Sequence, residues 1–409
     1  MLYNFFIILF YLAIGLAAFF NKKAKQWIKG RKQFPKLDLK HKSIWMHCAS
    51  LGEFEQGRTV IESLKKEYPH YPVVLSFFSP SGYENKKSYS GADHIIYLPL
   101  DTPKNAQKLI NEINPEIVLW VKYEYWFNYL NELKKRKIPV LLVSGIFRPS
   151  QPFFKWYGKK WKYILNSFEH LFIQNESSSE LLSSIGLKNK FIISGDSRFD
   201  RVIEIAEKKE TVEGIAEFIN NKKVLVAGST WEEDEELLVH YSKIEKNIKF
   251  IIVPHEIGSK HLKDLKKQFQ DSIFYSEINQ VINSNEYQTL IVDCIGLLSK
   301  LYQYATVTYV GGGFNSSGIH NSLEAAVFGK PIVFGPIYEK FAEARDLVDE
   351  GAASSVDNAI ELEKIFDSLF KNESSLTLSG TRAMKYVYAK RGATQKIMDY
   401  VEEKRLLTR

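Results

Sequence analysis

The segment IWMHCASLGEF at positions 44–54 decides the fold class of this chain. It opens with an apolar run, passes through a short turn at Gly52, and becomes helical in pattern from Glu53 onward. An apolar strand that leads directly into a helix is the repeating unit of a parallel sheet covered on both faces. The same unit recurs along the chain, so strands are predicted at 44–50, 73–78, 94–100, 116–121, 140–145, 170–174 and 190–194, and then at 224–228, 250–254, 289–293, 306–312 and 331–335.

These strands fall into two sets, which predicts an α/β protein with two Rossmann-like, doubly wound domains. A length of 409 residues suits two domains of ordinary size. The expected limits are 43–205 and 206–409, with the break near a charged helix around 203–211. Ligands of open α/β sheets bind at the carboxyl ends of the strands, so motifs directly after strands are the candidates for function.

Composition narrows the class of protein further. The chain is 45% hydrophobic and 25% charged, as in ordinary globular proteins. Its two cysteines, Cys48 and Cys294, lie far apart, which argues against a disulfide framework and against a structural zinc site. The net charge of +7 is concentrated in 22–42, where nine Lys or Arg accompany one acid. Nucleic-acid binding is the rival explanation of such a patch, but a basic patch alone is weak evidence for it, and no obligate protein partner is indicated.

The amino-terminal run LYNFFIILFYLAIGLAAFF at 2–20 predicts a membrane anchor helix over 1–21. A helix of this length spans roughly 28 Å, close to the thickness of the hydrocarbon core. The basic segment 22–42 would then contact anionic lipid headgroups, and the positive-inside rule places the body of the chain on the cytoplasmic face of the inner membrane. A cleaved signal peptide is disfavoured because no positive charge precedes the run. A helix that lies in the membrane interface is the remaining alternative.

Two motifs follow strands of the first domain. Gly52 and Glu53 come after the strand 44–50, where a carboxylate at a helix start is suited to take a proton from an acceptor hydroxyl. The alternative is that Glu53 only complements the helix dipole. The second motif, KYEYWFN at 122–128, combines aromatic and polar side chains as carbohydrate sites do, although a helix start with a core Trp126 explains it equally well. A basic-aromatic segment at 155–163 suits lipid headgroups or the outer face of a buried helix.

Two further motifs follow strands of the second domain. AGST at 227–230 places hydroxyls at a helix start, which is suited to a phosphate or to simple capping, and the acidic run 232–236 behind it is expected to be solvated. The second motif joins the glycines Gly311, Gly312 and Gly313 to GIHNSLEAA at 318–326. Glycines permit close approach of a ligand to the backbone, and Asn321 and Glu324 would share a helix face, suited to a ribose. His320 is either part of that site or a capping or core residue.

Taken together and in this order, the motifs resemble the Kdo transferase family, whose members transfer 3-deoxy-octulosonic acid. SLGE at 50–53 is similar to the family's S-x-G-E box, and KYEYWFN matches its E-T-E-L-W-P-N box at Glu124, Trp126 and Asn128. AGST and GIHNSLE match closely, as does FGPIYEKF at 334–341. The chain departs from the family at Pro254-His255-Glu256, where the family has P-R-H.

The resemblance implies an inverting glycosyltransferase of the GT-B fold, with CMP-Kdo as donor, a lipid A precursor as acceptor, and no cofactor or metal requirement. It implies that Glu53 is the general base. It further implies donor-binding residues in the second domain and acceptor-binding residues in the first. The donor set is Ser229, Thr230, His255, Gly311, Gly312, Gly313, His320, Asn321 and Glu324, and the acceptor set is Gly52, Glu124, Trp126, Asn128 and Arg148. A UDP-sugar transferase and a sugar-nucleotide epimerase of the same fold are the alternatives.

Overall fold

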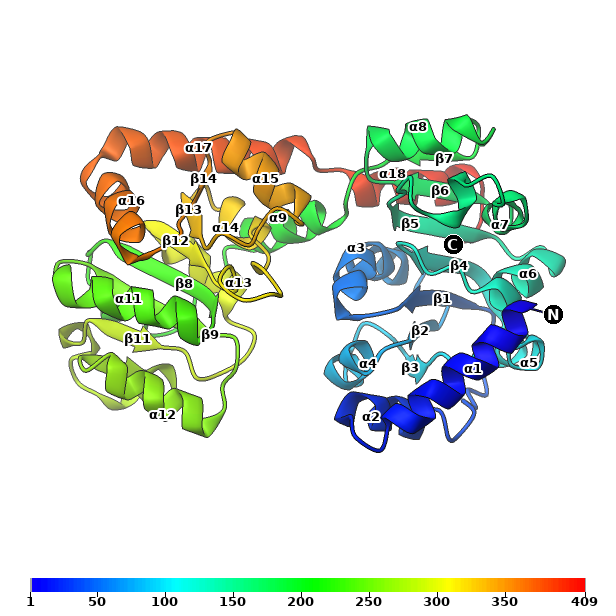
Figure 1. The fold of residues 1–409 in the computed structure, drawn as a ribbon, viewed down its shortest axis with the longest axis horizontal. Helices are drawn as coiled ribbons and strands as arrows, with labels where there is room; N and C mark the ends of the chain where they lie inside the picture. The colour runs from blue at the N-terminus through cyan, green and yellow to red at the C-terminus, as the bar shows by residue number, and fades with distance from the viewer. Residues whose placement is uncertain (1, 409) are drawn as a thin grey trace. The chain divides into compact units, whose positions relative to one another are not determined.

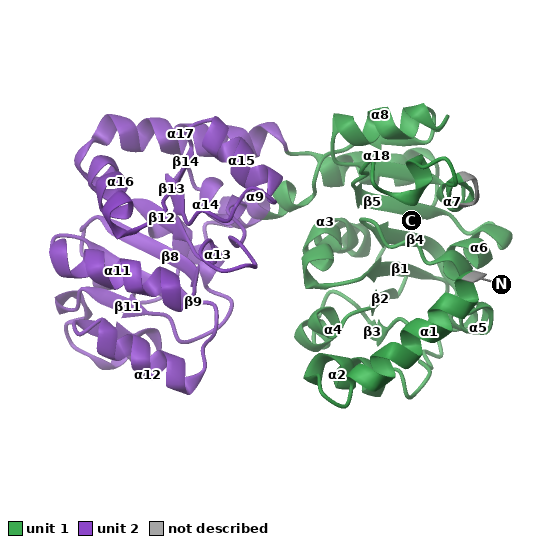
Figure 2. Cartoon of the chain, viewed as in Figure 1, with its two compact units in different colours: residues 1–201, 391–409 green, residues 202–390 purple. Residues whose placement is uncertain are grey.

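The chain forms two compact units in this computed structural model, which describes residues 2–408 apart from the side chains of Leu2, Lys159 and Lys160. Unit 1 comprises Met1–Arg201 together with Arg391–Arg409, and unit 2 comprises Val202–Lys390 (Figure 2). Each unit is built on one seven-stranded sheet (Figure 1). All recorded strand pairs are parallel.

The sheet of unit 1 has the order β3-β2-β1-β4-β5-β6-β7, so the chain starts in the middle and winds outward in both directions. Ile44 of β1 pairs in register with Val73 of β2 and with Ile117 of β4. Its strands are β1 Ser43–Cys48, β2 Val73–Phe77, β3 His94–Tyr97, β4 Pro115–Val121, β5 Val140–Gly145, β6 His170–Ile173 and β7 Phe191–Ile193. Its helices from the third onward are α3 Leu51–Glu67, α4 Pro80–Lys86, α5 Pro103–Ile113, α6 Phe127–Lys135, η1 Pro152–Phe154, α7 Lys159–Leu165, α8 Glu176–Ser184 and α18 Ala393–Glu403, while α9 Arg198–Lys208 leads into unit 2.

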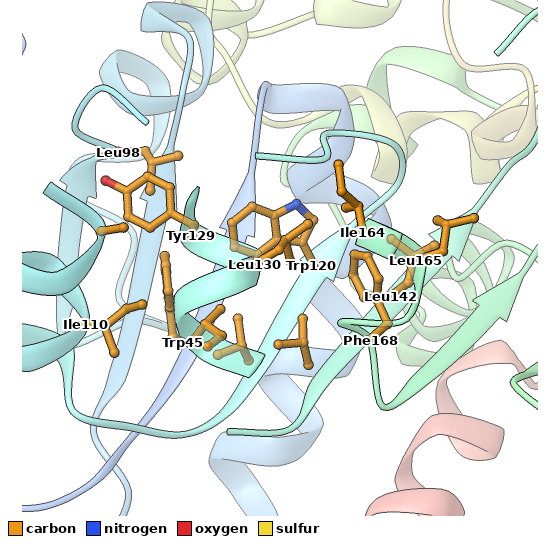
Figure 3. Packing of buried hydrophobic residues seen from close by; sticks show 14 of the residues in the cluster. Trp45, Leu98, Ile110, Trp120, Tyr129, Leu130, Leu142, Ile164, Leu165 and Phe168 are labelled. Carbon is orange, nitrogen blue, oxygen red and sulfur yellow. The ribbon is translucent and has the colours of Figure 1, made fainter. Parts of the chain in front are cut away.

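Alternation along β1 sends its side chains into two separate cores, because successive residues of a strand point to opposite faces. Trp45 packs on one face with Trp120 and Tyr129 (Figure 3). Met46 packs on the other face with Phe54 of α3. With both faces covered, the central strand β1 is buried along its whole length, and polar groups are admitted only where a partner is available.

Unit 2 repeats the plan with the strand order β10-β11-β9-β8-β12-β13-β14. Its strands are β8 Val224–Thr230, β9 Lys249–Pro254, β10 Ser272–Phe274, β11 Thr289–Ile291, β12 Val307–Val310, β13 Ile332–Phe334 and β14 Ala353–Ser355. Its helices are α10 Ile215–Ile219, α11 Glu232–Ile244, α12 Ser259–Gln268, η2 Tyr275–Gln280, η3 Ser284–Glu286, α13 Leu298–Leu301, η4 Tyr302–Tyr304, α14 Leu323–Ala326, α15 Ala342–Asp349, α16 Ala359–Lys371 and α17 Glu373–Ala389. Two doubly wound parallel sheets confirm the predicted fold class.

The units depart from the domain limits expected from sequence in one respect. The last residues of the chain return to unit 1, where α18 packs on α3. Asp200 holds this return by accepting from the backbone N–H groups of Gly392 at 2.6 Å and Thr394 at 2.7 Å. Apolar residues of α18, including Ile397 and Val401, complete the core on one face of the sheet. Sequence periodicity identifies α18 as amphipathic but carries no information about which sheet it covers.

The prediction of a membrane-spanning helix over 1–21 is not supported. The helix α1 covers only Leu2–Ala17, after which the chain turns and starts α2, Lys22–Gly30, at the capping residue Asn21. Within residues 2–408, no helix is both long and apolar enough to cross a bilayer. Instead, α1 lies against the rest of unit 1 (Figure 1). Ile7 is buried there, and the ring of Phe10 packs edge-on against Trp27. Apolar length alone overestimated the helix because the last apolar residues of the run form the turn.

Candidate active site

Glu53 lies at the carboxyl edge of the unit 1 sheet, two residues into the first turn of α3. Its carboxylate turns back over the helix start and accepts the backbone N–H of Ala49. This is the geometry in which an acid at the third helical position satisfies free N–H groups at a helix start. The side chain is 5% exposed and belongs to neither apolar cluster of unit 1. Its place in the first turn of α3 suits the helix dipole, which was the alternative prediction from sequence, but its burial distinguishes Glu53 from an exposed acid.

The electrostatic setting of Glu53 sets it apart from an ordinary capping acid. Burial raises its pKa to about 7, and the negative charge of Glu124 adds to the effect. The backbone N–H groups of Ala49 and Ser50 and the positive charge of Lys122 act in the opposite direction. A carboxylate whose pKa lies near neutral pH is matched to general-base catalysis in the cell.

The other predicted acceptor residues of this edge come from the segments after β1, β4 and β5. Gly52 is exposed, and a Cβ added there would meet nothing within 4 Å. Arg148 follows β5 and is also exposed. Its positive charge lowers the pKa of Tyr123, whereas burial and the charge of Glu53 raise that pKa. The structure thus brings Gly52, Glu53, Glu124 and Arg148 to one edge of the sheet.

Residues of the segment 122–128 hold parts of unit 1 together to a greater extent than the sequence indicates. Trp126 donates its indole N–H to Glu124 Oε2 at 2.8 Å, and its ring packs on Phe78. Asn128 donates its amide to the carbonyl of Asp101 at 2.7 Å and to the side-chain oxygen of Asn4 at 2.9 Å. Asn4 lies on α1, so the amide of Asn128 is occupied in fastening that helix. Glu124 is the one charged residue among these three, and its negative charge acts on Glu53.

The glycines of unit 2 serve the protein's own packing. A Cβ on Gly311 would lie 2.4 Å from the backbone oxygen of Ser229, and one on Gly313 would lie 2.6 Å from the backbone of Gly335. Gly311 and Gly313 therefore permit a close approach to their backbone, as the sequence predicts. The group that approaches, however, is another segment of the same chain and not a ligand. The result is a tight layer that joins the ends of β8, β12 and β13.

The acidic run at the start of α11 is solvated only in part, because Glu232, Glu233 and Glu236 are exposed whereas Asp234 and Glu235 are buried. Asp234 is fully buried and accepts from the backbone N–H groups of Gly312 at 2.8 Å and Trp231 at 2.9 Å, and from the hydroxyl of Tyr309 at 2.7 Å. Glu235 is 1% exposed and accepts the hydroxyl of Thr230 at 2.9 Å. The glycine loop is thus tied to the helix start by the buried carboxylate of Asp234, and the single proton of the Thr230 hydroxyl is committed to Glu235.

Three aromatic rings gather at the same edge of unit 2. The rings of Trp231 and His320 are nearly parallel, with 11° between their planes, and the indole N–H donates to His320 Nε2 at 3.1 Å. The ring of His255 stacks on both, with centroids 4.7 Å from Trp231 and 4.4 Å from His320. Burial, reinforced by the charge of His255, lowers the pKa of His320 to about 4. His320 is therefore neutral at physiological pH.

Asn321 and Glu324 meet as predicted, but not on a common helix. The amide of Asn321 donates to Glu324 Oε1 at 3.0 Å. The helix α14 begins only at Leu323, and Asn321 caps its start through a bond of 3.3 Å to the backbone N–H of that residue. The pair is half-buried and held in a fixed geometry, as a hydroxyl-binding pair requires.

Sequence reasoning missed three residues of these two edges: His47, Trp231 and Asp234. Trp231 and Asp234 both lie within four residues of the AGST motif, and this proximity is the signal that could have found them. His47 lies within the predicted strand, where a single histidine in an apolar run was the available signal.

Comparison with known proteins connects these edges to one family. The sequence profile described as 3-deoxy-D-manno-octulosonic-acid transferase (kdotransferase) matches residues 25–201. A 3-deoxy-D-manno-octulosonic acid transferase of Haemophilus influenzae is 26% identical over 88% of this chain and 86% of its own length. These matches support the Kdo transferase family for this chain. Residues 25–201 contain Glu53, Glu124 and Arg148, so the profile covers the whole edge described in unit 1.

Other relatives are larger or share only the fold. A bifunctional glycosyltransferase/methyltransferase of Fusobacterium nucleatum is 29% identical over 87% of this chain, which spans 57% of that relative's length. A structure titled putative UDP-N-acetylglucosamine 2-epimerase from Listeria monocytogenes superposes with a TM-score of 0.59 over 92% of this chain and 98% of its own, at 11% identity. At that identity the likeness concerns the fold alone, and it agrees with the predicted GT-B class.

Proposed function

We propose that this protein transfers Kdo from CMP-Kdo to a sugar hydroxyl of a lipid A precursor, with inversion at the anomeric carbon. Glu53 takes the proton of the acceptor hydroxyl, the oxygen forms the new bond to the anomeric carbon, and the bond to the phosphate of CMP breaks with its electron pair. CMP leaves from the opposite face of the donor ring. The family resemblance implies that no metal is needed, and this is part of the proposal.

The observation that carries the proposal is the state of Glu53. A general base must be largely unprotonated at working pH and still hold a proton well, so its best pKa lies near that pH. Burial and the neighbouring charge of Glu124 raise the pKa of Glu53 to about 7. Its place at the carboxyl edge of the sheet and beside the exposed Gly52 gives an acceptor a route to it.

The donor is assigned to the carboxyl edge of unit 2. Asn321 and Glu324 hold the ribose hydroxyls, because an amide and a carboxylate 3.0 Å apart provide both a donor and an acceptor. Ser229, Thr230 and the loop of Gly311, Gly312 and Gly313 lie near the phosphate or the base. Since His320 is neutral, backbone N–H groups rather than a histidine cation meet the negative charge there.

Attachment to the cytoplasmic face of the inner membrane completes the proposal, with α1 lying in the interface. Large apolar side chains of α1 and the turn after it are exposed, among them Phe6 at 61%, Leu16 at 69% and Phe20 at 96%. The next helix starts with Lys22 and Lys23, beside this apolar surface. An apolar helix face next to lysines is typical of helices that lie among anionic headgroups. Because Asn4 of α1 is bonded to Asn128, the membrane surface would lie close to the acceptor segment.

The test is an assay of the purified protein with CMP-Kdo and a tetra-acylated lipid A precursor, with products read by mass spectrometry. The proposal expects a mass increase of one or more Kdo residues and release of CMP. Calorimetric titration with CMP and with UDP separates the rivals, because a UDP-sugar transferase or an epimerase would bind UDP in preference. Binding of UDP alone, with no Kdo transfer, would rule the proposal out.

A further inference from the structure

A row of buried hydrogen bonds runs behind Glu124, from the interior of the sheet toward its carboxyl edge. The indole N–H of Trp45 donates to Ser76 Oγ at 2.8 Å, and Ser76 Oγ lies 2.9 Å from His47 Nδ1. On the other side of the ring, His47 Nε2 lies 3.4 Å from Glu124 Oε2. Trp45, His47 and Ser76 are entirely buried, and His47 and Ser76 are register partners on β1 and β2.

The direction of these bonds is fixed by the chemistry of the groups. An indole N–H only donates, so Ser76 Oγ accepts from Trp45 and keeps its own proton to give. His47 Nδ1 at 2.9 Å is a better acceptor position than the carbonyl of Met46 at 3.5 Å. If Nδ1 accepts, the proton of the neutral imidazole is on Nε2, and Nε2 faces Glu124. The order of donation is Trp45, Ser76, His47, Glu124.

Glu124 is held on its other side as well, by the indole N–H of Trp126 at 2.8 Å. Both N–H groups point to Oε2, so one oxygen of the carboxylate is fixed by two donors. The groups that act electrostatically on Glu53 from the neighbouring segment are Glu124 and Lys122. The thiol of Cys48 on the segment of Glu53 and the phenol of Tyr123 on the neighbouring segment also interact with Glu53. Of these groups, Glu124 is the one that disfavours the ionised form of Glu53 most.

We propose that His47 is a positioning residue for the reaction, which holds the Glu124 carboxylate in place beside Glu53 by donating from Nε2. Ser76 and Trp45 are the residues that set its tautomer. The inference rests on the proposed role of Glu53 as the base. It adds that His47 keeps the negative charge of Glu124 close to that base. His47 itself touches no substrate, because its ring is fully buried against Trp120 at 4.6 Å between ring centroids.

The experiment compares His47→Leu with His47→Gln. Leucine is of similar size and donates nothing, whereas the amide of glutamine reaches about as far as Nε2 and supplies an N–H group. The acid limb of the pH profile of kcat/KM reports the ionisation of the base. In His47→Leu the limb is expected to move down by about one pH unit, because Glu124 is no longer held beside Glu53. In His47→Gln it is expected to stay near the wild-type position.

A titration without substrate separates this inference from the proposed function. The side-chain carbon of Glu53, labelled with ¹³C and assigned by its absence in Glu53→Gln, is followed by NMR from pH 4 to 9. The midpoint is expected to fall in His47→Leu and to be retained in His47→Gln, whether or not Kdo transfer is observed. An unchanged midpoint in a folded His47→Leu would overturn the inference, even if the melting temperature had dropped.

Ser76→Ala provides a second variant in case His47→Leu does not fold. Removing the hydroxyl takes away the partner that holds the ring at Nδ1, so Nε2 of His47 is directed less firmly at Glu124. The midpoint of Glu53 is then expected to move in the same downward direction, by less than in His47→Leu. A midpoint identical to that of the wild-type protein in Ser76→Ala would likewise contradict the inference.

Discussion

The indole N–H of Trp231 donates to Nε2 of His320 at 3.1 Å, and the planes of the two rings are within 11° of parallel. Because an indole N–H cannot accept, Nε2 must carry the lone pair, and the neutral ring has its proton on Nδ1. Burial lowers the pKa of His320 to about 4, so this form persists throughout the physiological range. The residue after the AGST motif thereby sets the chemical state of the histidine in the glycine loop.

Replacing Trp231 with phenylalanine is expected to remove the hydrogen bond that fixes the tautomer of His320. Phe retains a flat ring to stack on His255 but offers no N–H, so His320 becomes free to place its proton on either nitrogen. Two-dimensional ¹H–¹⁵N NMR optimised for histidine rings distinguishes the tautomers, with the signals of His261, which lies 3.2 Å from Glu235, as an internal reference. A wild-type spectrum showing His320 protonated on Nε2 would contradict the assignment.

Gly52→Ala is expected to separate stability from turnover. A Cβ at this position meets nothing within 4 Å, and alanine in a helix is favoured over glycine by up to about 1 kcal/mol. The variant should be at least as stable as the wild-type protein, yet the methyl group would project where the acceptor approaches Glu53, so kcat/KM for the acceptor should fall by about tenfold or more.

The matched control is Gly57→Ala, one turn further along α3. There the new Cβ would lie 2.7 Å from Met46 Sδ and 2.9 Å from Val121, so the protein should be destabilised. Thermal melting and initial-rate kinetics measure both effects. Full activity in a stable Gly52→Ala would remove Gly52 from the acceptor route.

Glu53→Gln is expected to stabilise the protein at alkaline pH. The pKa of Glu53 is about 7 in the folded chain against an ordinary value of 4.5, so the folded state holds the proton more tightly than the unfolded state. The stability that this provides is fully present below about pH 4.5 and is lost as the pH rises through about 7.

The glutamine variant lacks this loss, so it should exceed the wild-type protein by about 1–3 kcal/mol at pH 8 and by little at pH 4.5. Urea unfolding at the two pH values measures the difference. The exposed Glu180→Gln serves as a control that should show no such pH dependence. An equal effect of Glu53→Gln at both pH values would mean that its carboxyl is not perturbed by burial.

Interfacial binding by α1 predicts a distinctive pattern of membrane release. A helix that lies among the headgroups is extracted by alkaline carbonate, whereas a spanning helix is not. Sedimentation with vesicles of phosphatidylglycerol and phosphatidylethanolamine should be weakened by Leu16→Ser and Phe20→Ser, whose side chains are 69% and 96% exposed. Ile7→Ser, at 7% exposed, should instead lower the melting temperature. Resistance to carbonate would favour a spanning segment over the interfacial one.

Most of the fold was predictable because parallel strands buried on both faces read as continuous apolar runs, as at 116–121. Two strands were missed: β10, Ser272–Phe274, and β14, Ala353–Ser355, each of three residues with too few apolar side chains to form a run. The carboxyl edges of both sheets were predictable for the same reason, because each edge lies where the apolar runs end. What sequence could not supply was pairing at a distance. The bond between Asn128 and Asn4 and that between Glu124 and His47 join residues far apart in the chain, and the burial of Asp234 depends on Gly312, which comes much later in the sequence.

Single-turnover transfer by Glu53→Gln, measured beside the affinity of the same variant for CMP, tests the central claim most directly. Glutamine keeps the shape and the capping oxygen but cannot accept the acceptor's proton, so the rate of Kdo transfer should fall by about 10²–10⁴-fold. The dissociation constant for CMP should stay within about twofold, because the residues proposed to bind the donor lie in unit 2 and the change is in unit 1. A transfer rate within a few fold of the wild-type value would contradict the assignment of Glu53 as the base.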